Sequence, residues 1–305
     1  MKYQSSLKWM IPLIFFLALF AAAAGLFWPA GDGQPYPLTT FRGEEVTINA
    51  RGLYYWDTVS SMAQMQANDL ITLVVGLPLL AFSTWLAFRG SLKGQLLLAG
   101  TLGFFLYTYM SMAFNTAFND LFIVYVALFS LSMYAFILAM MSFDLATLPG
   151  RFSEKLPRSW IAGLMIVSAV FLLVAWLGGR ILPTITQDAV PAMENTTTMV
   201  IQAMDLGLIM PFAVLAAVLL LRRSAWGYLL SSVAVMKFIT MGLAVSTMGI
   251  NMALNGEPDS AVLVGIFLVI TLANLVIATF LLKSIQQPAP KKMPALKAAR
   301  ASVKH

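Results

Sequence analysis

Eight long apolar segments dominate the chain, and each has the length of a membrane-spanning helix. A spanning helix needs about 20 consecutive, mostly apolar residues. Backbone groups in hydrocarbon need partners within their own segment, and these runs are too long and continuous for barrel strands. The sequence therefore predicts an all-α integral membrane protein with eight transmembrane helices, over residues 8–29, 69–88, 95–118, 121–143, 160–178, 200–221, 226–248 and 261–282.

The composition agrees with a surface that faces lipid. Of the 305 residues, 60% are hydrophobic and only 10% are charged, whereas a soluble domain carries about 25% charged residues. The net charge of +6 does not indicate a nucleic-acid partner, because six of the 19 basic residues lie between Lys283 and Lys304 and most others punctuate apolar runs. The lipid bilayer is the expected surrounding.

The scarcity of reactive side chains excludes several kinds of chemistry. The chain has no cysteine, so it has no disulfide, thiolate nucleophile or cysteine metal site. Its one histidine is His305, the last residue, which argues against a buried His base, metal or haem. Serine-hydrolase, intramembrane-protease, Walker and dinucleotide motifs are absent. We expect no enzyme activity, cofactor or metal; a membrane enzyme would have to use carboxylates, Tyr and Lys alone.

The distribution of basic residues predicts the orientation. With a cytoplasmic N-terminus and eight crossings, the cytoplasmic segments hold 15 Lys or Arg and the external segments hold three, Arg42, Arg51 and Arg180. Cytoplasmic loops are enriched in Lys and Arg, so both termini are expected in the cytoplasm. The first segment also reads as a signal peptide with a small-residue site at residues 21–24; we favour a retained helix, and whether it is cleaved stays open.

Two stretches of the chain resemble each other and predict an internal duplication. Residues 66–70 match 202–206, Pro78 pairs with Pro211, and residues 89–94 pair with 222–227. From the prolines onward the offset is 133, and a three-residue gap between Asp and Pro completes the match. We predict two four-helix repeats, residues 1–150 and 151–285, followed by a disordered basic tail at 286–305. Four is an even number, so the repeats would be parallel, as in some transporters.

The largest external loop is expected over residues 30–68. Within residues 37–49, an Arg42-Gly43 step flanked by β-forming residues predicts a small hairpin or an extended turn. Tyr54, Tyr55 and Trp56 follow. Such a cluster lies in the headgroup belt or forms a lid over a ligand, and both interpretations stay open.

Lys237 and Asp205 are ionisable residues within predicted spanning helices. A charge at this depth costs roughly 2.5–3.5 kcal/mol on insertion scales, which makes each a candidate functional residue. Their heights differ by about 7 Å at 1.5 Å per helical residue, so we predict that they pair. Three interpretations remain open: a structural ion pair, a substrate, ion or proton site, and a lysine that reaches into an unrelated cavity.

The third predicted helix carries a polar stripe in the half of the membrane nearer the outside. Thr108, Ser111, Asn115 and Asn119 recur at three- and four-residue spacing and so share one face. This stripe predicts a cavity open to the exterior, although hydrogen bonding between helices is a common use of such residues. The candidate ligand or ion site comprises Lys237, Asp205, Asp69, Tyr107, Ser111, Asn115, Asn119 and Asn274.

Residues 89–94, 103–109 and 118–131 carry a resemblance to a known group of proteins. The runs from Arg89 to Gly94, from Gly103 to Tyr109 and from Phe118 to Leu131 resemble an uncharacterised family of bacterial multi-pass membrane proteins. The resemblance is strongest over the second to fourth helices. It implies the bacterial cytoplasmic (inner) membrane and brings no substrate or catalytic residue.

The leading functional hypothesis is a small-solute or ion transporter or binding protein with an outward-facing polar pocket. Intramembrane charges and the predicted duplication motivate it. The alternative is a non-transporting sensor or assembly subunit in which the buried ion pair is structural.

Overall fold

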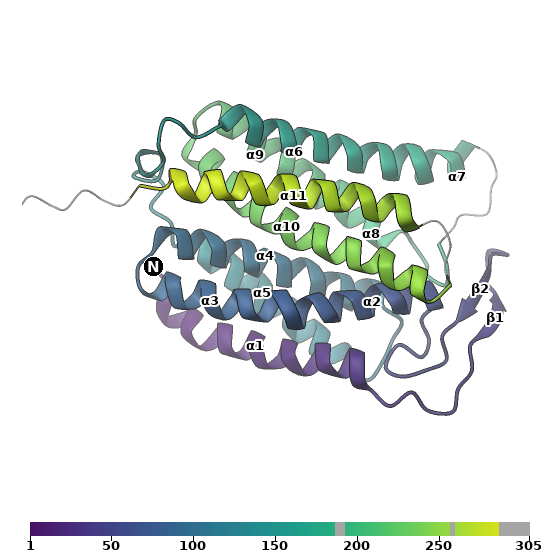
Figure 1. Ribbon diagram of the computed structural model, residues 1–305. Helices are drawn as coiled ribbons and strands as arrows, with labels where there is room; N and C mark the ends of the chain where they lie inside the picture. The colour runs from purple at the N-terminus through teal and green to yellow at the C-terminus, as the bar shows by residue number, and fades with distance from the viewer. Residues whose placement is uncertain (187–192, 257–259, 287–305) are drawn as a thin grey trace, which may run out of the picture.

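The computed structural model describes residues 1–186, 193–256 and 260–286 as a bundle of long helices capped at one end by a small hairpin (Figure 1). Within these residues, eight helical spans are long and apolar enough to cross a membrane, which confirms the predicted multi-pass architecture. They are Gln4–Phe27, Val59–Phe88, Leu92–Asn115, Phe122–Met140, Arg158–Thr186, Val200–Leu221, Ala225–Leu254 and Val264–Ser284. Of the predicted disordered tail, residues 287–305 lie outside the described residues, and Gln286 N–H donates to the Arg151 carbonyl at 2.8 Å.

Five spans are single helices and three are divided by a π-helical segment. The single helices are α1 (Gln4–Phe27), α4 (Leu92–Asn115), α5 (Phe122–Met140), α10 (Ala225–Leu254) and α11 (Ser260–Ser284). The divided spans are α2 (Val59–Ile71), η1 (Thr72–Gly76) and α3 (Leu77–Phe88); α6 (Arg158–Leu173), η3 (Val174–Ile181) and α7 (Leu182–Thr186); and α8 (Val200–Met204), η4 (Asp205–Ile209) and α9 (Met210–Leu221). A 3₁₀ turn, η2 (Pro149–Arg151), precedes α6.

Two helix boundaries differ from the predicted ones in ways that affect the site. The second span begins at Val59, ten residues before the predicted start at Asp69, because Thr58 caps it by accepting a hydrogen bond from Ser61 N–H at 3.0 Å. The predicted external loop at 30–68 is correspondingly shorter. The third span ends at Asn115, so the prediction that Asn119 shares its helical face is wrong.

A proline is the second residue of the α-helix that follows each of the three π-helical segments, and two of these segments have the same length. Pro78 and Pro211 each stand one residue into the α-helix that follows such a segment. A proline ring clashes with the carbonyl four residues earlier and removes one hydrogen bond, and those carbonyls belong to Val74 in η1 and Gly207 in η4. The extra residue in a π turn relieves that clash and bends the helix. Both segments begin six residues before their proline.

The turns after α3 and α9 have the same geometry. Ser91 N–H donates to the Leu86 carbonyl at 3.2 Å, and Ser224 N–H donates to the Leu219 carbonyl at 3.0 Å. The residue before each serine is left-handed, with φ of 83° and 55°. These are helix C-caps that satisfy otherwise unpaired carbonyls, and they send α4 and α10 back along α3 and α9.

The centre of the bundle is formed by α4 and α10. In the most apolar stretch of each, 67% and 72% of the residues are buried, against 39% or less in the other spans. α10 packs against α2, α4, α9 and α11, and α4 also packs against α3 and α5. At their crossing, a Cβ added to Gly100 would lie 2.4 Å from Met236 Cβ. Small residues allow such close backbone approach between membrane helices.

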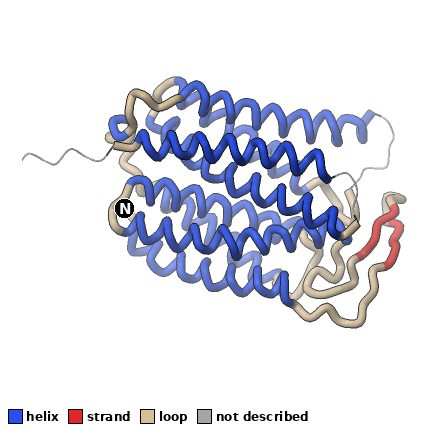
Figure 2. The backbone as a smooth tube through the Cα atoms, viewed as in Figure 1, coloured by secondary structure: helices blue, strands red, loops and turns tan. Residues whose placement is uncertain are grey.

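The hairpin confirms the first of the two structures expected for residues 37–49. β1 (Tyr36–Thr39) and β2 (Glu45–Ile48) pair antiparallel, with Tyr36 opposite Ile48 (Figure 2). Gly43 has a φ of 86°, which a glycine adopts without strain. Beyond the sheet, Arg42 donates to the Thr197 carbonyl at 2.9 Å, so the hairpin is tied to the segment that precedes α8.

Both ends of the described chain lie at the end of the bundle opposite the hairpin (Figure 1). Tyr3 N–H donates to Ser142 Oγ at 3.4 Å, which places the start of α1 beside the loop after α5. Ser153 N–H donates to the Ser284 carbonyl at 2.8 Å, which places the end of α11 beside the loop before α6. We refer to this end, with its short turns, as the turn end, and to the other as the hairpin end.

Candidate functional site

A chamber of about 250 Å³ lies inside the bundle, and helices from both halves of the chain form its walls. α2, α4, α6, η3, α8, η4 and α10 all contribute, together with one residue of α11. The walls are mainly apolar, with the side chains of Phe104, Phe171, Phe267, Met241 and Met248. Methionine and aromatic walls of this kind suit a ligand with an apolar body.

Asp205 is the acid of the chamber, and both of its oxygens are engaged. Tyr107 hydroxyl donates to Oδ1 at 2.6 Å, and Trp176 Nε1–H donates to Oδ2 at 2.8 Å. Asp205 is the first residue of η4, and its side chain is 2% exposed. A buried carboxylate is costly unless it accepts such bonds, so Tyr107 and Trp176 are what hold it in place.

Lys237 lies beside Asp205 without touching it. Its Nζ stands 3.8 Å from the centre of the Tyr107 ring, and the side chain is 6% exposed, facing the chamber. Within the described chain, no carboxylate oxygen lies within 4.0 Å of Nζ. The predicted direct Lys237–Asp205 pair is therefore wrong. Tyr107 joins the two charges instead, through its ring face on one side and its hydroxyl on the other.

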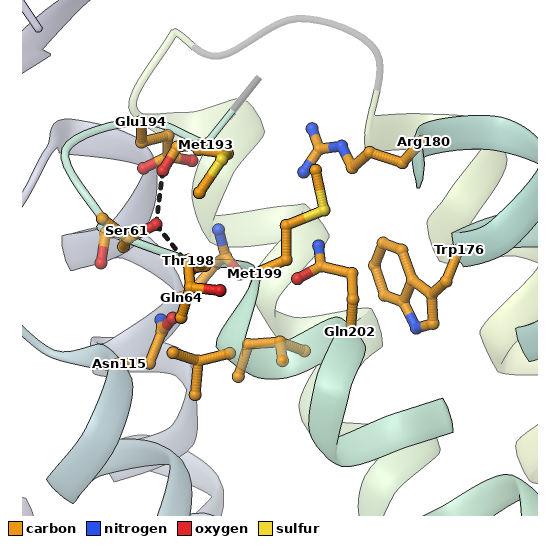
Figure 3. A pocket seen from close by; sticks show the side chains of 13 residues that line it. Ser61, Gln64, Asn115, Trp176, Arg180, Met193, Glu194, Thr198, Met199 and Gln202 are labelled. Atoms are coloured by element: carbon orange, nitrogen blue, oxygen red, sulfur yellow. Dashed lines mark hydrogen bonds between the residues drawn. The ribbon is translucent and has the colours of Figure 1, made fainter. Parts of the chain in front are cut away.

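A polar pocket of about 120 Å³, which we call the mouth, lies between the chamber and the hairpin end (Figure 3). Gln64, Trp176 and Ile201 line both spaces, so the two adjoin. Figure 3 shows Arg180 beyond Trp176, and Gln64 and Asn115 on the opposite side. The lining of the mouth is thus more polar than that of the chamber.

The acid of the mouth, Glu194, is also engaged by the protein. Its carboxylate accepts hydrogen bonds from the Thr58 hydroxyl and, at 3.0 Å, from Ser60 Oγ. The Arg180 guanidinium, by contrast, has no acceptor among the residues that the structure describes, and Arg180 is exposed. The mouth therefore presents a cation that is open to solvent.

Asp69 belongs to a separate cluster, beside α1 and away from the chamber. Tyr54 hydroxyl donates to Asp69 Oδ2 at 2.5 Å. A Cβ added to Gly25 would lie 1.8 Å from the same oxygen, so only glycine fits there. Tyr109 and Tyr125 stack nearby with ring centres 6.4 Å apart. Burial, and then the Asp69 charge, raise the pKa of Tyr54, which lies outside the spans.

Asn119 and Asn274 also lie away from the chamber. Asn119 follows the end of α4, where its Oδ1 accepts from Leu121 N–H at 3.0 Å. Asn274 is fully buried on α11 and donates to the Ile270 carbonyl at 2.9 Å. Of the predicted site residues, the structure thus gathers Lys237, Asp205, Tyr107 and Ser111 around the chamber and Asn115 at its mouth.

Three contributors escaped the sequence analysis: Trp176, Gln64 and Arg180. A tryptophan near the end of an apolar run is typical of the headgroup belt, so nothing in the pattern marked Trp176 as a donor to a residue 29 positions away. Gln64 was hidden because the apolar run begins after it. Arg180 was counted only as an external charge.

Asp57 fixes the loop that leads into α2. Its Oδ1 accepts from Ser61 Oγ at 2.8 Å and from Ala117 N–H at 3.1 Å, while Oδ2 has no partner among the described residues. Burial raises the pKa of the Asp57 carboxyl to about 6, although these two hydrogen bonds oppose the shift. Asp57 thereby connects the start of the second span to the end of the third.

Comparison of the chain with protein-family models, with curated proteins and with solved structures found no match. The resemblance to an uncharacterised bacterial family stays a prediction. The helices themselves fit a multi-pass membrane protein, with a chamber inside the bundle and a buried Asp205–Tyr107–Lys237 arrangement in its wall.

Proposed function

We propose that the protein binds a small solute in the chamber and moves it across the bacterial inner membrane. One observation carries this proposal: a buried ammonium and a buried carboxylate, held by one tyrosine, face a chamber that adjoins a polar mouth. Ionisable groups inside a membrane bundle mark substrate or ion pathways, since their burial is costly.

The charge distribution supports an outward-facing mouth. The turn end carries ten Lys or Arg residues among those described, from Lys2 to Lys283, and the hairpin end carries Arg42, Arg51 and Arg180. Cytoplasmic ends of membrane proteins are rich in Lys and Arg. The turn end, with both ends of the described chain, therefore faces the cytoplasm, and the mouth opens to the opposite side.

Shared geometry supports a duplication into two parallel repeats. The starts of η1 and η4, the two prolines, the two capped turns and the starts of α4 and α10 are all 133 residues apart. This register needs no gap. It pairs Thr72 with Asp205. The ungapped alignment therefore replaces the one in which a three-residue gap paired Asp69 with Asp205.

The pseudo-symmetry points to Lys237 as the residue that differs. α4 and α10 are equivalent helices that cross at the centre of the bundle, where the axis of parallel repeats would run. Phe104 and Lys237 occupy equivalent positions in that register, and both line the chamber. In the first repeat, the apolar side chain of Phe104 fills this position by packing alone. A lysine in the second repeat adds a charge that packing does not require.

A labelling experiment tests whether the chamber is open to solvent. The chain has no native cysteine, so an introduced thiol is the single site of labelling. Met241→Cys places one thiol on the chamber wall, and Ala213→Cys places one in the packed interior of α9, where the side chain is fully buried. In right-side-out vesicles, we expect a small membrane-impermeant thiol reagent to label the Met241 variant from outside and to spare the Ala213 variant. Equal labelling of the two would contradict an open chamber.

A flux experiment tests movement. Proteoliposomes containing the wild type, Lys237→Met or Asp205→Asn are screened with radiolabelled small organic solutes. We expect a solute whose uptake needs the wild-type chain and falls at least tenfold in both variants. Uptake that is unchanged in the variants would remove the site from the proposal, and uptake of nothing beyond that of empty liposomes would leave a binding protein without transport.

A further inference from the structure

We infer that the solute is a small amphipathic anion, with a carboxylate that binds Lys237 and an apolar or aromatic body that fills the chamber. The inference rests on the proposed function and names the class of solute that the same chamber takes. We call the path from the mouth into the chamber the route. The inference follows from which charged groups along this route already have hydrogen-bond partners in the protein.

The acids of the route are engaged. Asp205 accepts from Tyr107 and Trp176, one bond to each carboxylate oxygen. Glu194 in the mouth accepts from Thr58 and Ser60, again one bond to each oxygen. These donors belong to the protein, and their hydrogen bonds stabilise the two negative charges. Each of these carboxylate oxygens therefore already has one hydrogen-bond donor from the protein.

The two cations of the mouth and chamber lack hydrogen-bond acceptors among the described residues. In the described part of the chain, neither Lys237 Nζ nor the Arg180 guanidinium has a hydrogen-bond acceptor. An ammonium carries three donors, and the Tyr107 ring stabilises its charge without accepting a conventional hydrogen bond. A buried ammonium that lacks acceptors costs free energy. Its donors point to a ligand that supplies acceptors, and a carboxylate does so with charge assistance.

The two cations lie one after the other along the route: Arg180 lines the mouth and Lys237 lines the chamber. An anion entering from the hairpin end would meet the exposed guanidinium first and the buried ammonium second. Low-dielectric walls focus the field of the charges that line a cleft, so a cation without an acceptor there attracts an anion. The order of the two cations therefore favours entry of an anion from the mouth.

The rest of the chamber sets the body of the ligand. Its walls hold Phe104, Phe171 and Phe267 and several methionines, which pack against apolar surfaces and adapt to their shape. The volume of about 250 Å³ lies below the roughly 300–1,000 Å³ typical of pockets for drug-sized ligands. The chamber thus fits a compact molecule with one anionic group better than an inorganic ion, which would leave the apolar walls without a partner.

Three probes with one body and different heads test the inference: 3-phenylpropionate, 3-phenylpropan-1-ol and 3-phenylpropylamine. Binding to purified protein is measured by calorimetry and by the rise in unfolding temperature, since a ligand that binds the folded state stabilises it. We expect the carboxylate to bind about tenfold or more tightly than the alcohol, as one charge-assisted hydrogen bond would give, and the amine to bind weakest.

Variants assign that preference to Lys237. We expect Lys237→Met to lose the preference for the carboxylate and Lys237→Arg to keep it. Lys93→Met, at an exposed position on the turn end, is the matched control and should behave as the wild type. Because Lys237→Arg retains a cation, it also shows whether the loss in Lys237→Met reflects charge or misfolding.

The outcomes separate this inference from the proposed function. Equal affinity for the three probes, tighter binding of the amine, a preference that survives Lys237→Met, or no binding of any probe would each overturn the anionic class. An open chamber in the labelling experiment would then still stand, with a solute of another kind. If Met241→Cys and Ala213→Cys label alike, the proposed function fails even where the carboxylate binds elsewhere.

Discussion

The Lys237 ammonium lies 3.8 Å from the centre of the Tyr107 ring, and the hydroxyl of the same ring donates to Asp205 at 2.6 Å. One side chain thus serves two opposite charges by different means, because an aromatic face attracts cations and a phenol hydroxyl donates to anions. The charges are kept near each other without being in contact, which leaves the donors of Lys237 facing the chamber.

Substitutions of Tyr107 should therefore destabilise the protein in two separable steps. Tyr107→Phe removes the bond to Asp205 and keeps the ring, and we expect a loss of about 1–3 kcal/mol in unfolding free energy, the cost of an unsatisfied buried partner. Tyr107→Leu also removes the ring face and should cost roughly 0.5–2 kcal/mol more. Denaturant unfolding in detergent measures both, and Tyr134→Phe, at a side chain 55% exposed on α5, is the control. Equal losses from the Phe and Leu variants would exclude a role for the ring face.

Stability should depend on pH through Asp57. The folded chain holds the proton of the Asp57 carboxyl more tightly than the unfolded chain does. The pKa is about 6 in the folded chain, against about 3.9 for an unperturbed Asp. The contribution to stability is therefore full below about pH 4 and is lost as the pH rises through about 6. We expect the unfolding temperature of the wild type, relative to that of Asp57→Asn, to be higher at pH 4.5 than at pH 7.5. Asp120→Asn, at an exposed site nearby, should leave the wild-type dependence unchanged.

Gly25 should tolerate no side chain. A Cβ at this position would lie 1.8 Å from Asp69 Oδ2 and 2.7 Å from the Tyr54 hydroxyl, so Gly25→Ala must displace a buried hydrogen bond. We expect a loss of about 1–3 kcal/mol, typical of overpacking, measured by denaturant unfolding. Gly163→Ala on α6, where nothing lies within 4 Å, should be neutral or slightly stabilising. If the Gly25 variant were as stable as the Gly163 variant, the contact between α1 and α2 would be looser than described.

The features that the sequence predicted well depend on local pattern. Spanning helices follow from runs of apolar residues, and the hairpin follows from Arg42-Gly43 between β-forming residues, so both could be read without a structure. The nearness of Lys237 and Asp205 followed in part from predicted depths that differ by only about 7 Å. Depth is set by counting residues along a helix, which needs no tertiary information.

The features that the sequence missed depend on contacts between distant residues. α4 ends at Asn115, and just beyond it Ala117 N–H donates to Asp57, 60 residues earlier; no pattern near Asn119 signals this. The direct Lys237–Asp205 pair failed because depth fixes height but not rotation about the helix axis. Rotation puts the Tyr107 ring over Lys237 and the Trp176 indole on Asp205.

The orientation can be measured with two single cysteines. Thr39→Cys lies on the exposed hairpin and Ala146→Cys lies in the exposed loop after α5, at the turn end. Because basic residues gather at the turn end, we expect an impermeant maleimide to label Thr39→Cys in intact spheroplasts and Ala146→Cys only after lysis. The reverse result would turn the mouth to the cytoplasm and make the proposed route one of export.

Gly94 and Gly227 should be equally intolerant of a side chain, because each lies three residues after the serine of a turn with the same geometry. A Cβ at Gly94 would lie 2.4 Å from Leu86 Cβ, and a Cβ at Gly227 would lie 2.2 Å from the Leu219 carbonyl carbon. Leu86 and Leu219 are also the residues whose carbonyls cap the preceding turns. Alanine at either site must therefore push a helix away from its neighbour, and we expect losses in unfolding free energy of about 1–3 kcal/mol that agree within about 1 kcal/mol. Gly207→Ala, with nothing within 4 Å, is the control. If one glycine tolerated alanine and the other did not, the shared turn geometry would not reflect shared packing, and the case for a duplication would rest on sequence alone.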